Sequence, residues 1–188
     1  MKIKSALAYS HTLLQSVVQA GDVVVDATVG NGHDTEFLAN LVGPSGRVYG
    51  FDVQQLAIDN TTARLKNSNL LSRVRLFHQG HEQIEQVLAK DVQIKGAMFN
   101  LGYLPGGDHQ MITNGATTIK AIKACLTRLT PSGIIGIVLY YGHPGGLTEK
   151  NAVMKFANQL PQKQFTVLQY QFINQVNEPP ILLAIQKR

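Results

Sequence analysis

Cysteine is nearly absent from this sequence. Cys125 is the only one, so no disulfide can form within the chain. This usage is typical of the reducing cytosol, and we expect a cytoplasmic protein. Cys125 falls in an apolar pattern of helical spacing, which favours a buried thiol over a nucleophile. Long apolar runs are also missing, so we expect neither a signal peptide nor a membrane span, and no membrane partner.

Several motifs that carry chemistry are missing too. The six histidines are scattered, and the chain has no C-x-x-C or H-E-x-x-H spacing, so we expect no metal site. It also lacks the G-x-x-x-x-G-K-[ST] loop that binds nucleoside triphosphates and the G-x-S-x-G elbow that carries a nucleophilic serine. These absences argue against a metalloenzyme, a P-loop protein and a serine hydrolase.

Charged residues make up only 15% of the chain and apolar residues 44%, which indicates a globular protein. With 188 residues we expect one domain, residues 1–188, in which an N-terminal helix (1–20) precedes the core (21–188). Seventeen basic and twelve acidic residues give a net charge of +5. This balance suits an anionic partner such as RNA, although many basic proteins bind no nucleic acid.

The most informative stretch is 23–35. Three valines lead into Asp26, Gly30 and Gly32 follow, and a helix-like run comes next. This pattern predicts a buried strand, a tight turn and a helix whose first N–H groups can meet a ligand. A second short strand ends in Asp52, twenty residues after Gly32, where nucleotide-binding units place a carboxylate on a ribose.

The turn differs from the dinucleotide fingerprint G-x-G-x-x-G, because Thr35 replaces the third glycine. An acid at the end of the first strand, followed by G-x-G, instead resembles the first motif of class I S-adenosylmethionine (SAM) methyltransferases. A Rossmann-like domain for another nucleotide is the alternative at this point.

Strands and helices alternate along most of the chain. We expect strands near 23–27, 47–52, 73–78, 94–100 and 134–140, then an antiparallel pair near 165–172 and 181–185. Helices are expected near 5–19, 33–42, 54–67, 81–89, 113–129 and 147–159. The alternation predicts an α/β fold with a mostly parallel sheet and helices on both faces. The terminal antiparallel pair resembles the end of the seven-stranded sheet of class I methyltransferases, so the expected fold is Rossmann-like and of that class. Ligands bind such sheets at the carboxyl ends of the strands.

The fourth expected strand ends in Asn100-Leu101-Gly102-Tyr103. Amino-directed methyltransferases carry N-P-P-Y or D-P-P-Y at this place, so Asn100 and Tyr103 match while the two prolines are replaced. An asparagine oxygen can accept a hydrogen of an amine and aim its lone pair for in-line displacement. A neighbouring histidine or tyrosine can take the amine's proton, directly or through water. The alternatives are an asparagine that caps a turn and a tyrosine that only lines a cleft.

Three further features border the predicted cleft. The loop Tyr140-Tyr141-Gly142-His143 offers two aromatic rings to flank a base and a proton acceptor, or it is a glycine-rich turn with one buried and one exposed tyrosine. His11, on the first helix, either faces the site or is a surface or cap histidine. The amide-rich run 174–180 either reads base edges or forms a polar hairpin.

Four stretches resemble, in order, one small bacterial family: 26–35, 100–105, 141–146 and 174–180. This family of tRNA wobble-uridine methyltransferases, formerly labelled rRNA methylases, converts 5-aminomethyl-2-thiouridine to 5-methylaminomethyl-2-thiouridine. The resemblance spans about residues 5–187 and implies a SAM-dependent enzyme that grips the anticodon stem-loop of tRNA alone or as a homodimer. The alternatives are an rRNA base methyltransferase, a small-molecule N-methyltransferase and a non-catalytic SAM-binding module. The intact Asn100 loop and both ligand acids favour an enzyme.

The resemblance also implies site residues. The glycine-rich loop would hold the methionine part of SAM, Asp52 and Gln54 the ribose, and Gly80 and His81 the adenine. The expected cofactor-binding residues are Asp26, Thr28, Gly30, Asn31, Gly32, His33, Asp34, Thr35, Asp52, Gln54, Gly80 and His81. The expected catalytic residues, which would meet the target amine and base, are Asn100, Tyr103, Tyr141 and His143. Two basic groups are either phosphate contacts or solvated surface: Arg64, Lys66, Arg73 and Arg75, and Lys120, Lys123 and Arg128.

Overall fold

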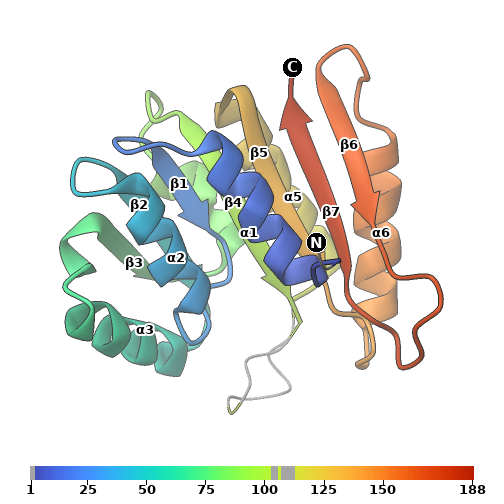
Figure 1. Cartoon of the computed structure of the whole chain (residues 1–188), viewed down its shortest axis with the longest axis horizontal. Coiled ribbons are helices and arrows are strands. Elements are labelled where there is room, and N and C mark those ends of the chain that lie inside the picture. Colours follow the sequence, from blue (N-terminus) through green and yellow to red (C-terminus); the bar gives the residue numbers. More distant parts are fainter. Residues whose placement is uncertain (1–2, 103–105, 107–112) are drawn as a thin grey trace.

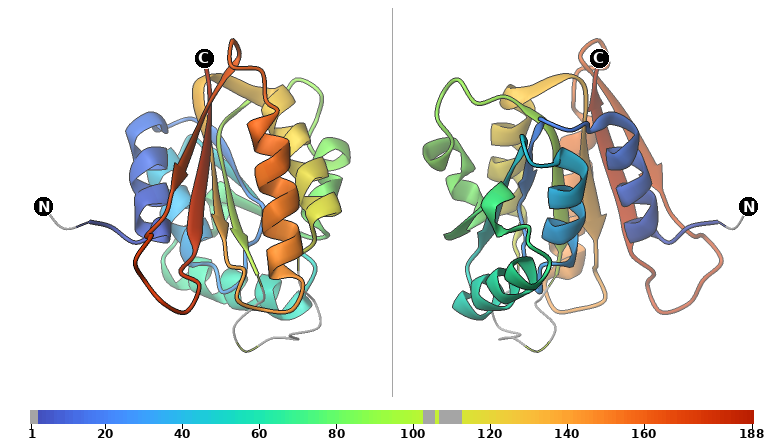
Figure 2. Two further views of the ribbon diagram at one scale, coloured as in Figure 1. Left: turned by 90° about the vertical axis from the view of Figure 1, so that its right-hand side faces the viewer. Right: turned by 60° about the vertical axis from the view of Figure 1, so that its left-hand side comes forward.

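The computed structural model describes residues 3–102, 106 and 113–188. Within these residues a single seven-stranded sheet lies between two layers of helices (Figures 1 and 2). Helices α1, α2 and α3 cover one face of the sheet, and α4, α5 and α6 cover the other. The α/β fold with helices on both faces is therefore confirmed.

The strand order is β3-β2-β1-β4-β5-β7-β6, in which the first five strands are parallel and β7 is antiparallel to both of its neighbours. The strands are β1 (Val23–Asp26), β2 (Arg47–Asp52), β3 (Val74–His78), β4 (Ile94–Leu101), β5 (Leu129–Leu139), β6 (Phe165–Tyr170) and β7 (Ile181–Lys187). From β1 the chain continues to β2 on one side and later returns to β4 on the other. The carboxyl ends of β1 and β4 therefore border the crevice at which such sheets bind ligands.

The helices agree with the expected positions except at one place. They are α1 (Ala6–Val17), α2 (His33–Val42), α3 (Gln55–Asn67), α4 (Ile84–Val87), α5 (Gly115–Arg128) and α6 (Gly146–Asn158), with short 3-10 turns η1 (Leu71–Arg73) and η2 (His81–Gln83). The expected helix 81–89 is thus a 3-10 turn followed by one helical turn. None of the helices in the described part of the chain has the length and apolarity that a membrane crossing requires.

Local chemistry explains where the elements near the crevice begin. The valines of β1 form an apolar run because this strand is flanked on both sides and covered on both faces. Ser5 caps α1 by accepting a hydrogen bond from the backbone of Ala8 at 3.2 Å. Asn114 caps α5 in the same way, with its Oδ1 accepting from the N–H groups of Ala116 and Thr117.

Two apolar clusters fasten the helices to the sheet. Phe51 and Phe99 are fully buried in the cluster beneath α4, α5 and α6. Leu14 and Leu38 belong to the cluster beneath α1, α2 and α3. A side chain at Gly96 would place its Cβ 2.8 Å from Leu14 Cδ2, so this glycine allows α1 to pack directly on β4. The close packing of α1 matters for the site, because this helix carries His11.

Arg128 is a structural residue, and the expectation that it contacts phosphate is wrong. Its side chain is buried. Nη1 donates to the carbonyl oxygens of Ala89 at 2.6 Å and Val92 at 3.3 Å, and Nη2 donates to those of Leu88 at 3.2 Å and Glu85 at 3.4 Å. The guanidinium therefore joins α4 and the turn that follows it to the last residue of α5.

We predict that Arg128→Met lowers the free energy of unfolding by about 3 kcal/mol, because it removes a buried guanidinium whose hydrogen bonds hold the chain after α4 to the end of α5. Lys120→Met, on the exposed face of the same helix, is the matched control and should change stability by less than about 0.5 kcal/mol. Urea unfolding followed by circular dichroism measures both. Equal midpoints for the two variants would contradict the structural role of Arg128.

Candidate active site

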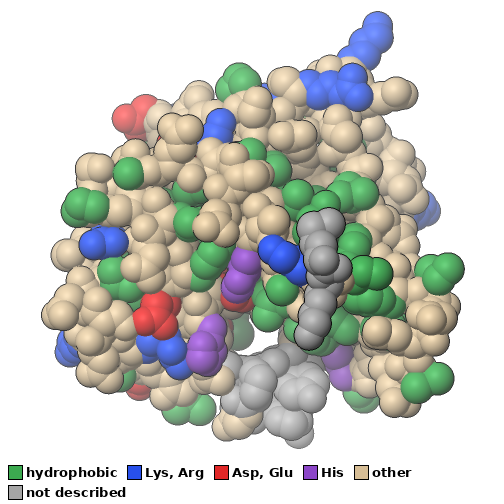
Figure 3. Space-filling model, in the orientation of Figure 1, with side chains coloured by type: hydrophobic (Ala, Val, Ile, Leu, Met, Phe, Trp, Pro, Cys, Tyr) green, Lys and Arg blue, Asp and Glu red, His purple; other side chains and the backbone are tan. Residues whose placement is uncertain are grey.

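A cavity of about 560 Å³ opens at the carboxyl ends of β1, β2 and β4. The loops after these strands line it, together with η2, the start of α5 and Tyr140 after β5. On the face shown in Figure 3 the surface is hollowed, and histidine and acidic side chains gather beside the hollow. Among the described residues no group of three or more histidines, cysteines or carboxylates could hold a metal ion.

The glycine-rich loop has the predicted geometry. Gly30 and Gly32 have positive φ angles of 53° and 80°. A Cβ at Gly32 would lie 2.6 Å from Thr61 Oγ1 and 3.0 Å from its Cα, so α3 packs against the loop backbone. The Thr61 hydroxyl also donates to the carbonyl oxygen of Gly30 at 3.1 Å. Glycine is needed here for the backbone conformation and for the close approach of α3.

Asp26 lies beneath this loop and does not line the cavity. Its carboxylate accepts hydrogen bonds from the hydroxyl of Thr35 at 2.6 Å and from the backbone of Thr28 at 3.2 Å. Burial, and after it the nearby Asp34, raise the pKa of Asp26 to about 7. Asp26, Gly32 and Thr35, which were expected to bind the cofactor, therefore shape the loop from below and are not among the residues that line the cavity.

Asp52 does line the cavity, at the end of β2. Its Oδ2 accepts a hydrogen bond from the backbone of Gly30 at 2.9 Å, and its Oδ1 accepts one from the backbone of Gln54 at 2.9 Å. A carboxylate oxygen can accept two hydrogen bonds, so each of these oxygens retains capacity for a ligand hydroxyl. Gln54 is itself buried and lines the same part of the cavity.

His81 forms part of the cavity wall as a neutral side chain. Its ring is buried, and Nδ1 lies 3.1 Å from the carbonyl oxygen of Ala27, which identifies Nδ1 as the protonated nitrogen. Burial lowers the pKa of His81. Its Nε2 lies 3.5 Å from the hydroxyl of Thr118. The ring thus supports the end of β1 from the side of α5, and Gly80 beside it also lines the cavity.

Glu149 was not expected from the sequence. It is a buried carboxylate on α6 that accepts hydrogen bonds from the hydroxyls of Thr113 at 2.6 Å and Thr118 at 2.7 Å. Together with His81 it fixes the start of α5 at the cavity. No local pattern reveals such a contact, because the partners come from two different helices and the segment before α5.

Asn100 lines the cavity at the end of β4 and is held there by two hydrogen bonds. Its backbone N–H donates to Thr28 Oγ1 at 2.7 Å, and its side-chain Nδ2 donates to Asp34 Oδ2 at 3.2 Å. Its side-chain Oδ1 is buried and has no hydrogen-bond partner among the described residues. A buried acceptor in this state is unfavourable until a donor reaches it, which makes Asn100 Oδ1 a receptor for a ligand hydrogen.

His11 is half-buried and reaches the site through Asp34, although it is not among the residues that line the cavity. Its Nε2 lies 2.8 Å from Asp34 Oδ1, and its ring stacks on Phe37 with the centroids 4.0 Å apart. Asp34 is buried at the start of α2. Because its carboxylate contacts both His11 and Asn100, it joins α1 to the end of β4. The structure thus gives the Asp34 carboxylate two protein partners at the cavity.

The aromatic ring at the cavity comes from Tyr140, one residue before the expected one. Tyr140 lines the cavity, whereas Tyr141 packs on the larger core cluster with Lys150 Nζ 4.4 Å from its ring centroid. Successive residues at a strand end point to opposite sides, which explains the exchange. Burial and then Asp34 raise the pKa of the Tyr140 hydroxyl.

The two remaining expected catalytic residues are His143 and Tyr103. His143 lies near Gly102, with its Nδ1 3.1 Å from the carbonyl oxygen of Pro144 and its Nε2 3.8 Å from where a Cβ on Gly102 would stand. It is not among the lining residues. Tyr103 lies outside the described residues.

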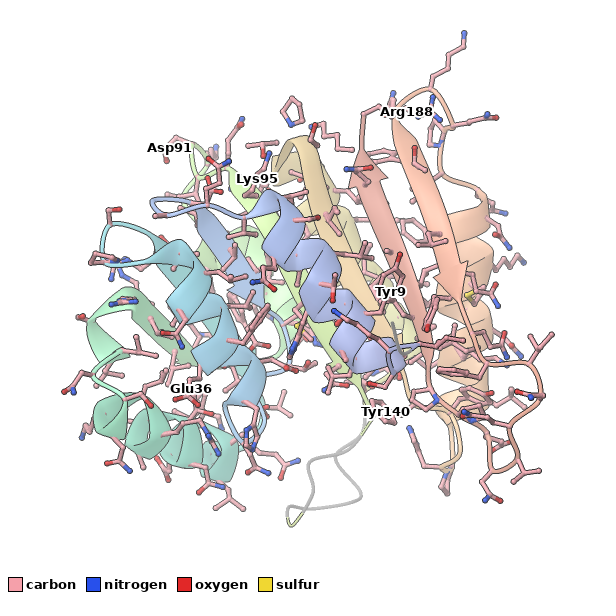
Figure 4. The ribbon with its side chains drawn as sticks, in the orientation of Figure 1. Tyr9, Glu36, Asp91, Lys95, Tyr140 and Arg188 are labelled. Atoms are coloured by element: carbon pink, nitrogen blue, oxygen red, sulfur yellow. The ribbon has the colours of Figure 1, made fainter. Side chains whose placement is uncertain are left out.

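Among the residues expected to bind the cofactor, those that line the cavity are Thr28, Gly30, Asn31, His33, Asp34, Asp52, Gln54, Gly80 and His81. The backbone of Asn31 also accepts a hydrogen bond from Arg64 Nε at 2.9 Å, and Arg64 Nη1 pairs with Glu36 at 3.0 Å. This pair lies beside the start of α2, where Figure 4 labels Glu36. Arg64 thus stabilises the loop that the sequence placed at the cofactor.

Comparison with known proteins identifies the family to which the chain is similar. The family described as "Putative rRNA methylase" matches residues 48–186. The protein named tRNA (mnm(5)s(2)U34)-methyltransferase, chloroplastic, from Arabidopsis thaliana is 35% identical to this chain over 98% of it and 70% of the relative's own length.

Solved structures agree with that family. A protein from Clostridium thermocellum described as a "putative rRNA-methylase" is 48% identical, with a TM-score of 0.97 and all of both chains covered. A "putative methyltransferase" from Streptococcus mutans, solved in complex with SAH, is 42% identical, with a TM-score of 0.91 and all of both chains covered. The crevice between β1 and β4 and its glycine-rich loop agree with these relatives. The chain therefore belongs to the family described as "Putative rRNA methylase" and is a SAM-dependent methyltransferase.

Proposed function

We propose that this enzyme converts the 5-aminomethyl group of wobble 5-aminomethyl-2-thiouridine in tRNA to 5-methylaminomethyl. The observation that carries the proposal is the Asn100 side chain, whose buried Oδ1 has no partner among the described residues and is suited to accept an amine hydrogen. The 35% identity to a tRNA (mnm(5)s(2)U34)-methyltransferase supports this substrate. The net charge of +5 suits a polyanionic partner such as the anticodon stem-loop.

The cavity fits the cofactor in size and in charge. Its volume of about 560 Å³ is in the range of roughly 300–1,000 Å³ that small-molecule sites occupy. Three acidic residues, Asp34, Asp52 and Glu82, line it and favour a ligand that carries positive charge. When bound, S-adenosylmethionine supplies a methyl group on a positively charged sulfur, which is an electrophile for an amine.

Different residues at the cavity would hold the ribose, methionine and adenine parts of the cofactor. Asp52 and Gln54 would hold the ribose hydroxyls, because Asp52 keeps free acceptor capacity at both oxygens. The N-terminus of α2 and the backbone around Gly30 would meet the methionine part. Gly80 and the buried His81 ring would border the adenine.

At the target end, Asn100 would orient the amine and Tyr140 would flank the base. An amine that donates a hydrogen to Asn100 Oδ1 has its lone pair aimed away from the asparagine, and fixed geometry of this kind supplies much of the rate of a displacement. Tyr140 is 39% exposed, and its ring would offer a face on which a pyrimidine can stack. In this proposal Tyr140 takes the place that the sequence assigned to Tyr141.

Nucleoside mass spectrometry tests the proposed function. The tRNA from a strain that lacks the gene should accumulate 5-aminomethyl-2-thiouridine, and the purified protein with SAM should add one methyl group to that nucleoside. Unchanged tRNA together with methyl transfer to rRNA would favour the rRNA alternative that the family's description names. Methyl transfer to small amines without any RNA would overturn the RNA substrate altogether.

We predict that Asn100→Ala lowers kcat on this tRNA by about 100-fold, because the amine is then no longer oriented for in-line attack. The dissociation constant for SAM should stay within about twofold, a difference of only about 0.4 kcal/mol in binding free energy. Asn40→Ala removes an exposed asparagine on α2 and is the matched control. Single-turnover kinetics and calorimetry measure the two quantities, and a kcat equal to that of the control would be incompatible with the proposal.

We predict that Asp52→Asn weakens SAM binding by about tenfold, equivalent to about 1.4 kcal/mol, because it removes a charge and an acceptor for a ribose hydroxyl. At saturating SAM the kcat should recover to near the wild-type value. Asp91→Asn, at an exposed turn away from the cavity, is the control. Calorimetric titration measures the dissociation constant for SAM. A wild-type value in Asp52→Asn would show that Asp52 does not bind the cofactor.

A further inference from the structure

We propose that Asp34 is a positioning residue that fixes which end of the Asn100 amide is presented to the substrate amine. This inference rests on the proposed function, because it concerns the orientation of an amine by Asn100. It departs from the sequence-based expectation, in which Asp34 contacts the cofactor. Two described contacts of its carboxylate carry the inference, one to Asn100 and one to His11.

The first contact determines the direction of the amide. The two ends of an asparagine amide have almost the same shape but opposite hydrogen-bonding character, so a neighbour must select one of them. An ionised carboxylate only accepts, and Asp34 Oδ2 lies 3.2 Å from the side-chain nitrogen of Asn100. In the flipped amide two oxygens would face each other at this distance. Asp34 therefore directs Asn100 Oδ1 away from itself.

The oxygen selected in this way is the one that lacks a partner. Asn100 Oδ1 is buried and has no hydrogen-bond partner among the described residues. An amine has hydrogens to donate, whereas the opposite amide orientation would present N–H groups to it. The Asp34 contact thus converts a chemically ambiguous side chain into a dedicated acceptor at the cavity.

The second contact keeps the Asp34 carboxylate in place. His11 Nε2 lies 2.8 Å from Asp34 Oδ1, and the His11 ring stacks on Phe37 at 4.0 Å. The ring therefore cannot turn freely. Because α1 packs closely on β4 through Leu14 and Gly96, the histidine, the carboxylate and the amide form a chain from α1 through α2 to β4.

The backbone of Asn100 is fixed separately. Its N–H donates to Thr28 Oγ1 at 2.7 Å, and the β4 ladder pairs Asn100 with Val138 of β5. The direction of the side-chain amide is therefore the remaining freedom that a neighbour has to remove. A substitution at position 34 that preserves shape should alter this direction and leave the strand in place.

A reciprocal exchange tests the proposal. The proteins compared are the wild type, Asp34→Asn, Asn100→Asp and the double variant Asp34→Asn/Asn100→Asp. We expect Asp34→Asn to lower kcat by about 30-fold, since misdirected groups cost up to about 100-fold. Asn100→Asp places two carboxylates side by side and should be at least as slow. In the double variant, the new amide at position 34 donates to the new carboxylate at position 100, whose other oxygen accepts the amine.

The double variant should therefore recover to within about tenfold of the wild-type kcat, a non-additive effect that only two coupled residues produce. KM for tRNA and the dissociation constant for SAM should stay within about threefold throughout. Asp59→Asn, the same change at an exposed site on α3, is the control. Thermal melts of all variants verify that each is folded before its rate is interpreted.

Two results would overturn the proposal: an Asp34→Asn variant with wild-type kcat, or a double variant as slow as the slower single variant. Weaker SAM binding in Asp34→Asn that the second substitution does not restore would instead assign Asp34 to the cofactor.

An NMR measurement separates this inference from the proposed function. The side-chain 15N–1H signals of Asn100 should include one proton that exchanges slowly with solvent in the wild type and rapidly in Asp34→Asn. A wild-type protein inactive on tRNA would contradict the proposed function, and these signals would still decide the orientation of the amide. Equal exchange in the two proteins would refute the orientation claim.

Discussion

The hydrogen bonds that join the loop after β1 to the end of β4 are the interaction on which the rest of the site depends. Thr28 Oγ1 accepts a hydrogen bond from the backbone N–H of Asn100 at 2.7 Å, and Asp34 Oδ2 accepts one from the Asn100 side-chain nitrogen at 3.2 Å. β1 and β4 are adjacent in the sheet, and the chain diverges to opposite sides after β1. These bonds therefore connect the cofactor loop directly to the residue that would meet the amine.

Burial of carboxylates sets the chemistry around these bonds. Asp26 lies beneath the loop, where burial raises its pKa to about 7 and two hydrogen bonds from the loop itself satisfy it. Asp34 and Asp52 lie at the cavity with protein donors on every oxygen. A cavity bordered by fixed acceptors favours cationic and hydrogen-donating ligands, which is consistent with a sulfonium cofactor and an amine substrate.

Much of this could be predicted from the sequence, because it depends on local patterns. Apolar periodicity located the seven strands of the described residues, and the glycine-rich turn with acids at two strand ends located the edge of the sheet at which the cavity opens. Contacts between distant segments could not be predicted, since no local pattern encodes them: the pairing of His11 with Asp34 and the burial of Arg128 are examples. The sequence also could not decide which of Tyr140 and Tyr141 lines the cavity, because a shift of one residue at a strand end reverses the direction of a side chain.

The measurement that tests the central claim most directly is a crystal structure of the enzyme with SAH and an anticodon stem-loop that carries 5-aminomethyl-2-thiouridine. The account predicts the amine nitrogen about 3 Å from Asn100 Oδ1, with Asp34 on the opposite end of the amide. It also predicts the base against Tyr140. An amine held by another residue, or an Asn100 amide turned with its nitrogen toward the substrate, would contradict the account.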